Sequence, residues 1–501
     1  MRTLNKFKAL ALAMLLMASL NFAVAQGDNP FIQSKYWADQ PSLETIKADM
    51  AKGHSVLEAN SGGFDATTYA ILNNNPLTTI QFLVEQGNSV NKRTHDSRTY
   101  IFWAASRANI EAMEYFMTQG AKTDLRDSHD YTVAQFAAAG GQQSPEIYDF
   151  FEANGVDLKN QKTAEGKNIL HILAPRLTNY GMLDYFQLRG FDLNELDGNG
   201  NGLFNYAARS GNTELLEELV DRGVKYSENK VTGENAILMA SSNRENTVEY
   251  FKYLENLDLS PAVKTNEGVS ALHRIAASNT NLDVYNYFLS KGLNVNDTDS
   301  NGNTPLINAA GRNSLEMVTF LAEKTKDINH VNKEGQSALT MAVMRNNAEV
   351  VDYLLSKGAN AKVKDEKGNT LGQYLISSYR ANNVKDFDQK LKSLSAKGLD
   401  LKQKQGDKST LFHLAIDKND LSLLKKVNAL KVDINAKNNE GATVLHLAAM
   451  KAADDEILKY LISIGADKNS TTEFEETAFD LAQENEKLTN NKVDLGFLKA
   501  K

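Results

Sequence analysis

The sequence predicts an all-α solenoid, a fold that stacks small two-helix units. A Gly-x-Ser/Thr-x-Leu template occurs at residues 302–306, 335–339 and 441–445, and a helix-like apolar pattern follows each copy. Positions equivalent to its last residue, here called anchors, recur every 33 to 36 residues, with one interval of 40. A period of this length is typical of repeat architectures. The anchors are Thr68, Ile101, Ala134, Leu170, Phe204, Ile237, Leu272, Leu306, Leu339, Gly372, Phe412, Leu445 and Phe479.

Composition limits the classes of function. The 501 residues are 42% hydrophobic and 24% charged, which favours a folded core over disorder. Lys plus Arg number 55 and Asp plus Glu 63, a net charge of −8, so the chain has no basic excess for phosphates and no nucleic acid partner is expected. Because the chain has no cysteine, disulfides, thiolate catalysis and cysteine zinc sites are excluded.

The first 25 residues are expected to be a signal peptide. Arg2, Lys6 and Lys8 precede an apolar run over residues 9–20, and residues 23–25 read Ala-Val-Ala, the small-x-small pattern that a signal peptidase recognises. Cleavage after Ala25 would leave Gln26 first, in a periplasmic or secreted protein. No later apolar stretch is as long, so no membrane span is expected in the mature chain.

An N-terminal half-cap is predicted over residues 26–62, because residues 42–50 have the pattern of a second helix without an ordinary first helix before it. The repeats then form a first block, residues 63–376, and a second block with a C-terminal cap, residues 406–501. Residues 377–405, which lie within the 40-residue interval, are predicted to lengthen a connection between helices.

Each unit predicts two helices joined by a turn. After the anchor Leu339, Ala342 and Val343 share one helical face, and Leu354 and Leu355 belong to the stripe of a second helix. The residue three after the anchor is alanine in nine units, which lets neighbouring helices approach closely. Glycines end most second helices, and Asn- and Asp-rich turns follow them.

The best template copies are Thr-Val-Leu-His-Leu-Ala-Ala at residues 443–449 and Thr-Pro-Leu-Ile-Asn-Ala-Ala at residues 304–310. They resemble the Thr-Pro-Leu-His-x-Ala signature of ankyrin repeats, whose 33-residue unit has two antiparallel helices and a projecting hairpin. The resemblance covers about residues 31 to 485 and implies an all-α ankyrin-repeat solenoid of about thirteen helix-turn-helix units with short hairpin loops. The sequence departs from the family pattern in that only Pro305 fills the proline position, and three units lack the glycine that ends the second helix.

Residues that look chemical have structural explanations. Four histidines fill the signature position, where the resemblance implies hydrogen bonds near the turn: His171, His273, His413 and His446. Residues 197–202 and 297–302 imitate the start of a calcium loop, but position twelve is Ala208 or Asn308 where a glutamate is needed. No nucleophile elbow, phosphate loop or zinc helix occurs, so no enzyme activity, cofactor or metal is expected.

Binding is expected on the concave face that the resemblance implies, made of hairpin tips and first helices. The position two after the anchor is expected to point toward this face, and six such residues are the predicted partner-binding stripe: Trp103, Phe136, Ile172, Tyr206, Met239 and Arg274. Trp, Tyr and Arg are common in interface hot spots, whereas the alternative is that these side chains only fill the groove between helices.

The predicted function is a non-enzymatic scaffold or adaptor that binds a protein partner after export, with the chain itself monomeric. Two alternatives remain open: a small-ligand receptor or enzyme that uses the concave groove, and a structural spacer in an envelope assembly. Analogy at the level of the fold does not identify the partner.

Overall fold

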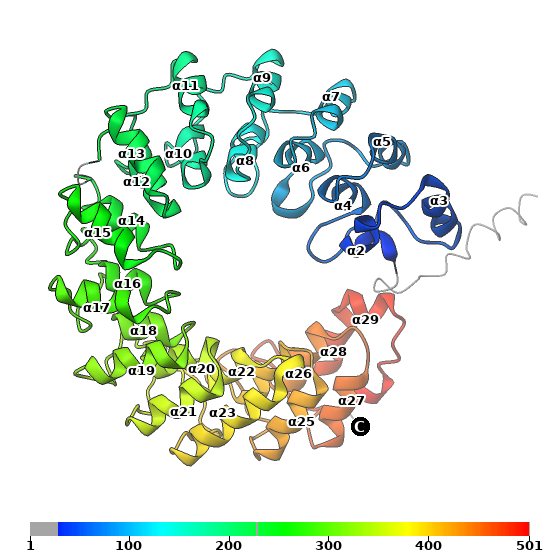
Figure 1. Ribbon diagram of the computed structural model, residues 1–501. Helices are drawn as coiled ribbons and strands as arrows, with labels where there is room; N and C mark the ends of the chain where they lie inside the picture. The colour runs from blue at the N-terminus through cyan, green and yellow to red at the C-terminus, as the bar shows by residue number, and fades with distance from the viewer. Residues whose placement is uncertain (1–28, 227–228, 500–501) are drawn as a thin grey trace, which may run out of the picture. The chain divides into compact units, whose positions relative to one another are not determined.

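The computed structural model describes residues 29–226 and 229–499, so the predicted signal peptide lies outside the described residues. The chain divides into two compact units, the first ending at Val231 and the second beginning at Thr232. Within the described ranges all regular elements are helices, and short bridges such as Lys364 to Thr370 close hairpins. The all-α solenoid is confirmed (Figure 1).

Each repeat of the first unit pairs a short first helix with a second helix of eight or nine residues. In Figure 1 its first helices α4, α6, α8, α10 and α12 follow one another on one side, and the second helices α5, α7, α9, α11 and α13 on the other. The elements are η1 (Pro30–Ile32), α2 (Ser34–Ala38), α3 (Leu43–Ala51), α4 (Ala66–Leu72), α5 (Leu77–Glu85), η2 (His95–Ser97), α6 (Tyr100–Ser106), α7 (Ile110–Thr118), α8 (Val133–Ala139), α9 (Pro145–Ala153), α10 (Ile169–Leu173), η3 (Ala174–Arg176), α11 (Gly181–Leu188), α12 (Leu203–Ala207), η4 (Ala208–Ser210) and α13 (Thr213–Asp221).

The second unit continues the same alternation and ends in a short cap. Its first helices pack against the next first helix, as α18 does on α20 and α20 on α22. The elements are α14 (Ala236–Ala240), α15 (Val248–Asn256), α16 (Ala271–Ile275), α17 (Leu282–Ser290), α18 (Pro305–Ala310), α19 (Leu315–Lys324), α20 (Ala338–Arg345), α21 (Ala348–Ser356), α22 (Leu371–Ser378), η5 (Ala381–Asn383), α23 (Val384–Ala396), α24 (Leu411–Ile416), α25 (Leu421–Ala429), α26 (Val444–Lys451), α27 (Glu456–Ser463), α28 (Ala478–Glu484), α29 (Glu486–Asn490) and η6 (Gly496–Leu498).

Sequence signals explain where the first helices begin. All of the anchor positions lie in first helices, and a Ser, Thr, Asn or Asp usually precedes the helix as its cap. The Thr304 hydroxyl oxygen accepts the Ile307 backbone N–H (3.3 Å) and Pro305 takes the first helical position, where its missing N–H costs nothing. The buried alanines Ala309 and Ala342 lie three after their anchors and allow close helix packing.

Three asparagines, Asn279, Asn313 and Asn346, form a ladder between consecutive repeats of the second unit. Asn313 Nδ2 donates to the carbonyl oxygens of Ala276 and Asn279 (both 2.9 Å), just beyond the end of α16. Asn346 Nδ2 repeats the contact one repeat later, with the carbonyls of Ala310 (3.0 Å) and Asn313 (2.9 Å). The ladder thus satisfies carbonyl groups that a helix end leaves open.

The 40-residue interval contains the long helix α23, whose 13 residues exceed the nine of α21. Phe387 of α23 packs edge to face on Tyr379 with ring centroids 5.2 Å apart. Lys390 is buried in the same helix, where its Nζ lies 2.9 Å from Asp386 Oδ2 and donates to the Val343 carbonyl oxygen (3.4 Å). Residues 377–405 therefore hold the turn η5 and this second helix, inside the second unit.

Terminal elements close both ends of the described chain. In the predicted half-cap, Phe31 and Trp37 are fully buried, and the Trp37 indole N–H donates to the Phe31 carbonyl oxygen (2.9 Å). At the other end, Leu488 of α29 and Leu498 of η6 are fully buried. No helix of the described chain combines the length and the apolar character that a membrane crossing needs.

Candidate binding face

The signature histidines join each first helix to the following hairpin. His446 Nδ1 accepts the Thr443 backbone N–H (3.1 Å), and its Nε2–H donates to the Ser470 carbonyl oxygen (2.9 Å). His413 makes the equivalent pair of bonds, and burial lowers the pKa of both imidazoles below the ordinary value. The structural role predicted for these histidines is confirmed.

Side chains two after the anchor reach back to their own hairpin. The Trp103 indole N–H donates to the Thr94 hydroxyl oxygen (2.8 Å), and the Tyr206 hydroxyl donates to Asp197, in each case nine residues earlier. Asp197 also accepts the Asn201 backbone N–H (2.8 Å) through its other oxygen, so this carboxylate organises the hairpin that imitates a calcium loop. Within the described residues, no three His, Asp or Glu side chains converge as metal ligands.

The six residues of the predicted stripe are divided between the units, four in the first and Met239 and Arg274 in the second. Trp103, Ile172, Tyr206 and Met239 are 6 to 8% exposed, so each presents only an edge to solvent. The partner-binding role of the stripe stays a prediction.

Phe136 and Arg274 are the half-buried members of the stripe. The Arg98 guanidinium lies 4.1 Å from the Phe136 ring centroid and is held there by Asp127, 2.8 Å from its Nε. Arg274 lies 2.5 Å from Glu234 and donates to the Leu238 carbonyl oxygen (2.6 Å). Both side chains therefore have fixed positions at the surface.

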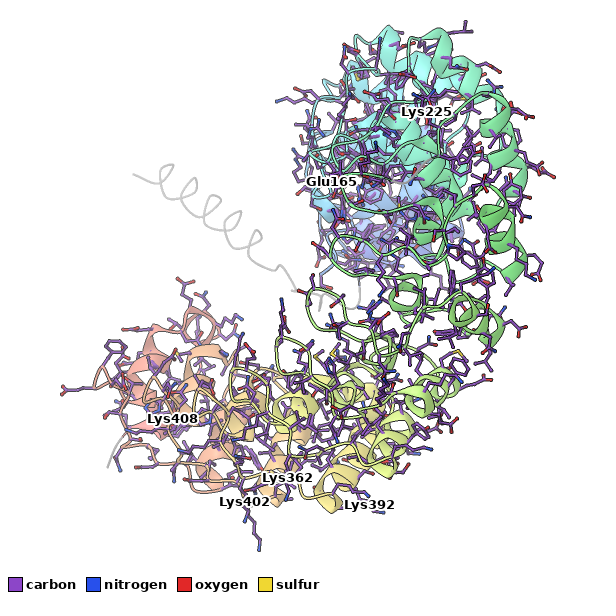
Figure 2. The ribbon with its side chains drawn as sticks, turned by 90° about the vertical axis from the view of Figure 1, so that its left-hand side faces the viewer. Glu165, Lys225, Lys362, Lys392, Lys402 and Lys408 are labelled. Carbon is purple, nitrogen blue, oxygen red and sulfur yellow. The ribbon has the colours of Figure 1, made fainter. Side chains whose placement is uncertain are left out.

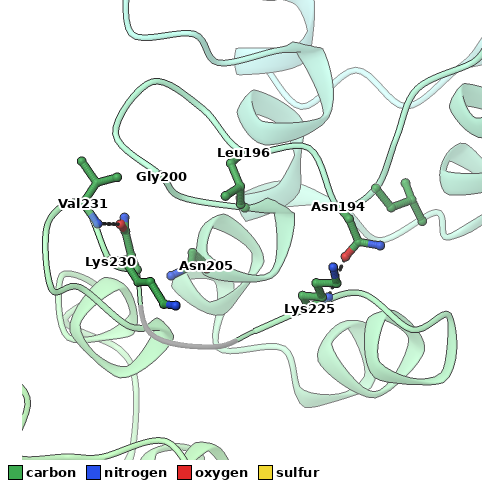
Figure 3. A pocket seen from close by; sticks show the side chains of 10 residues that line it. Asn194, Leu196, Gly200, Asn205, Lys225, Lys230 and Val231 are labelled. Carbon is green, nitrogen blue, oxygen red and sulfur yellow. Dashed lines mark hydrogen bonds between the residues drawn. The ribbon is translucent and has the colours of Figure 1, made fainter.

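A surface hollow of the first unit was not predicted. It lies between the hairpin of α12 and the loop after α13, has a volume of about 300 Å³, and is lined in part by Leu196, Asn205, Lys225, Lys230 and Val231 (Figure 3). Leu196 and Val231 are each 60% exposed. Residue spacing alone gives no signal for it, because the lining comes from two loops rather than from one repeated position.

The second unit carries a basic segment at residues 357–437, with sixteen lysines and one arginine against nine acidic residues. Lys362 and Lys402 hold equivalent positions in consecutive repeats, and they are exposed, as are Lys392 and Lys408 (Figure 2). The acidic net charge of the whole chain conceals this local excess.

Comparison with protein families agrees with the repeat geometry. A family model described as ankyrin repeats (3 copies) matches residues 252–332, 272–365 and 378–472. Among solved structures, the crystal structure of the human ASB11 ankyrin repeat domain is 21% identical, covers 46% of this chain and 99% of its own, and has a TM-score of 0.39. A comparison with curated protein sequences finds no match. The family match shows that residues 252–365 and 378–472 are ankyrin repeats, and the two-helix units built on the repeated anchors continue the same local architecture through the rest of the described chain.

Proposed function

We propose that the chain is a non-enzymatic scaffold that binds a protein partner through its hairpin tips and first helices. Ankyrin repeats form protein–protein interaction modules. The observation that carries the proposal is that contacts within the chain already hold the side chains of this face in position. Trp103 and Tyr206 donate hydrogen bonds to their own hairpins, and the Arg98 guanidinium packs on the Phe136 ring. A face with few rotamers left to immobilise loses less entropy on binding.

Partner contact is assigned to the more exposed members of the stripe. Phe136 and Arg274 supply an aromatic ring and a guanidinium, two groups that often dominate interface energies. Within the first unit, the exposed edges of Trp103, Ile172 and Tyr206 would support the partner beside Phe136.

The test starts with capture of a partner by the purified chain and continues with affinity measurements on variants. Phe136→Ala should weaken binding by about 2 kcal/mol, because the contact ring is lost. The control is Leu188→Ala, which removes an 87% exposed apolar side chain from a second helix and should leave affinity unchanged. Equal affinities for wild type and Phe136→Ala would reject this face as the binding site.

Export belongs to the same proposal. The charged start, the apolar run over residues 9–20 and the Ala-Val-Ala sequence support cleavage after Ala25 and action in the periplasm or outside the cell. N-terminal sequencing of protein from the envelope fraction should begin at Gln26, and a chain that keeps Met1 would contradict export by cleavage.

A further inference from the structure

One position of each repeat can tie that repeat to the loop of the next. It lies ten residues before each anchor, and asparagine occupies it in seven of the thirteen repeats. Asn329 Oδ1 accepts the Asn360 backbone N–H (2.7 Å), and its Nδ2 donates to the Gly358 carbonyl oxygen (3.3 Å). Asn435 makes the same two contacts with the repeat that follows it (2.8 and 3.0 Å). Asparagine suits this position because its amide accepts and donates at once.

Lysine replaces this asparagine in two consecutive repeats, those of Lys362 and Lys402. These repeats stand between those of Asn329 and Asn435, which keep the contacts. A lysine ammonium donates but cannot accept, so the bond to the backbone N–H of the next loop cannot form in either repeat. Positions that depart from the local pattern of a fold are often functional. The two lysines therefore indicate a requirement for positive charge.

Lys362 and Lys402 belong to a row of exposed lysines on α21, α23 and the loops after these helices, here called the lysine edge. A Cβ added at Gly398 would lie 3.0 Å from Lys362 Cε, so the Lys362 side chain lies beside the end of α23. Figure 2 shows Lys362, Lys392 and Lys402 along one side of the second unit. The members of the lysine edge are Lys357, Lys362, Lys392, Lys397 and Lys402.

The lysine edge has few counter-ions within the protein. All residues from 357 to 437 are described, and in the described chain four of the five Nζ atoms have no carboxylate oxygen within 4 Å. The exception is Lys357, whose Nζ lies 3.7 Å from Glu323. Asp400 is an exposed acid of the same loop, and one of its oxygens accepts the Lys402 backbone N–H (2.9 Å). The edge thus keeps an excess of positive charge that an anionic partner would neutralise.

The residue types favour a lipid surface over a protein as this partner. Residues 357–437 contain sixteen lysines and one arginine, whereas protein interfaces are rich in arginine and poor in lysine. Lysine carries a compact, hydrated charge on a flexible stem, which suits many separate phosphates. Between Val331 and Met450, a stretch that is described throughout, no large apolar side chain is exposed. The lysine edge would therefore rest on lipid headgroups without inserting between the acyl chains.

We propose that the lysine edge holds the second unit against a membrane surface of anionic phospholipid headgroups. The ammonium groups contact the lipid phosphates, and the flexible stems let each lysine follow the headgroups. The edge consists of second helices and the loops after them, so the hairpin tips and first helices stay open to the partner proposed above. The inference does not depend on that partner, because lipid binding requires no protein.

The first test is co-sedimentation with vesicles of the chain from Gln26 onward, so that the apolar run over residues 9–20 does not contribute. Vesicles of phosphatidylglycerol and phosphatidylcholine in equal parts should bind the chain at about 0.05 M salt and release it at about 0.5 M, because salt screens exposed charges. Vesicles of phosphatidylcholine alone should not bind it. No binding to the anionic vesicles or equal binding to both kinds would overturn the proposal. Tighter binding to soluble polyglutamate than to the anionic vesicles would also overturn it and assign the edge to an acidic protein.

A double variant tests the edge without damage to the fold. Lys362→Asn with Lys402→Asn introduces the residue that makes the contacts in the neighbouring repeats, so the melting temperature should stay at or above that of the wild type. The partition coefficient on the anionic vesicles should fall at least about tenfold. The matched control is Lys333→Asn with Lys408→Asn, which removes two exposed charges from hairpins of the same unit and should leave binding unchanged. Unchanged binding of the edge variant, equal weakening by the control, or a lower melting temperature of the edge variant would overturn the proposal.

Discussion

At the residue scale, the buried stripe side chains should act mainly on stability. Trp103→Ala removes a side chain that is 6% exposed, so the free energy of unfolding should fall by roughly 3 to 5 kcal/mol. Tyr206→Phe keeps the ring but removes the hydroxyl that donates to Asp197, and should cost about 1 kcal/mol. Chemical unfolding of both variants measures these losses. Wild-type stability for Trp103→Ala would show that the ring is not part of the core.

The sequence predicted which position of each repeat faces the hairpins but not how deeply its side chain is buried. Spacing places Trp103 and Tyr206 two after their anchors. The two side chains bond to Thr94 and Asp197, nine residues earlier, and a periodic pattern does not encode such bonds or the exposed fraction of a ring. The lysines and the buried amide of the hollow could not be predicted for the same reason, since they meet only when two loops fold together.

The signature histidines should make stability depend on pH. Burial lowers the pKa of His171, His273, His413 and His446 in the folded chain, so below about pH 6.5 the unfolded chain binds protons that the folded chain excludes. The stability contributed by these groups should therefore be present above about pH 6.5 and decline as the pH falls from about 6.5 to 5.5, so a series from pH 7.5 to 5.5 spans the change. Thermal unfolding across this range measures the decline.

One repeat of the chain has glutamine at the histidine position, and this suggests a control variant for the pH dependence. Gln135 takes the position of the histidine in its own repeat, and its Oε1 accepts the Thr132 backbone N–H (3.0 Å). His446→Gln should therefore keep the cap at Thr443 while it removes one titrating group, and its melting temperature should fall less on acidification. The same fall as in wild type would mean that His446 does not titrate in this range.

At the element scale, the asparagine ladder should connect neighbouring repeats strongly. Asn313→Ala leaves the buried carbonyl oxygens of Ala276 and Asn279 without this donor, so the free energy of unfolding should fall by roughly 1 to 3 kcal/mol. Asn286→Ala changes an exposed asparagine on α17 and serves as the matched control. Equal stabilities of the two variants in denaturant titrations would show that the ladder contributes little.

Helices of ordinary length could be predicted from the sequence, and the long helix α23 could not. Its register places Phe387 and Leu394 in the core, but the buried position between them is Lys390, so the apolar stripe is interrupted where a second helix was expected. The interval itself, with the stretch Ser-Tyr-Arg-Ala-Asn-Asn at residues 378–383, predicts only a lengthened connection between helices. The structure places the lysine ammonium beside Asp386, a pairing that a hydrophobic pattern does not represent.

At the scale of the whole molecule, the period predicted the all-α solenoid because each repeat meets mainly its neighbours, so local sequence determines most contacts. The local charge distribution could not be predicted from the composition of the whole chain, because the basic segment at residues 357–437 lies in a chain whose net charge is −8.

Because each repeat packs mainly on its neighbours, a destabilising substitution should unfold mainly the unit that contains it. Ala309 is fully buried in α18 of the second unit. Ala309→Asp therefore places a carboxylate in the core, where burying a charge is costly. Both tryptophans, Trp37 and Trp103, lie in the first unit, so their fluorescence reports that unit alone, whereas circular dichroism reports every helix. On heating, the variant should lose part of its helical signal first, at a temperature where tryptophan fluorescence is still that of the wild type.

The reciprocal variant makes this prediction decisive. Ala104→Asp introduces the same lesion in α6 of the first unit, where Ala104 is also fully buried. Its fluorescence transition should move to lower temperature, while a part of the helical signal from the second unit persists to higher temperature. If fluorescence and circular dichroism instead coincide in one transition for both variants, the two units unfold together, and coupling between them exceeds the cost of the buried carboxylate.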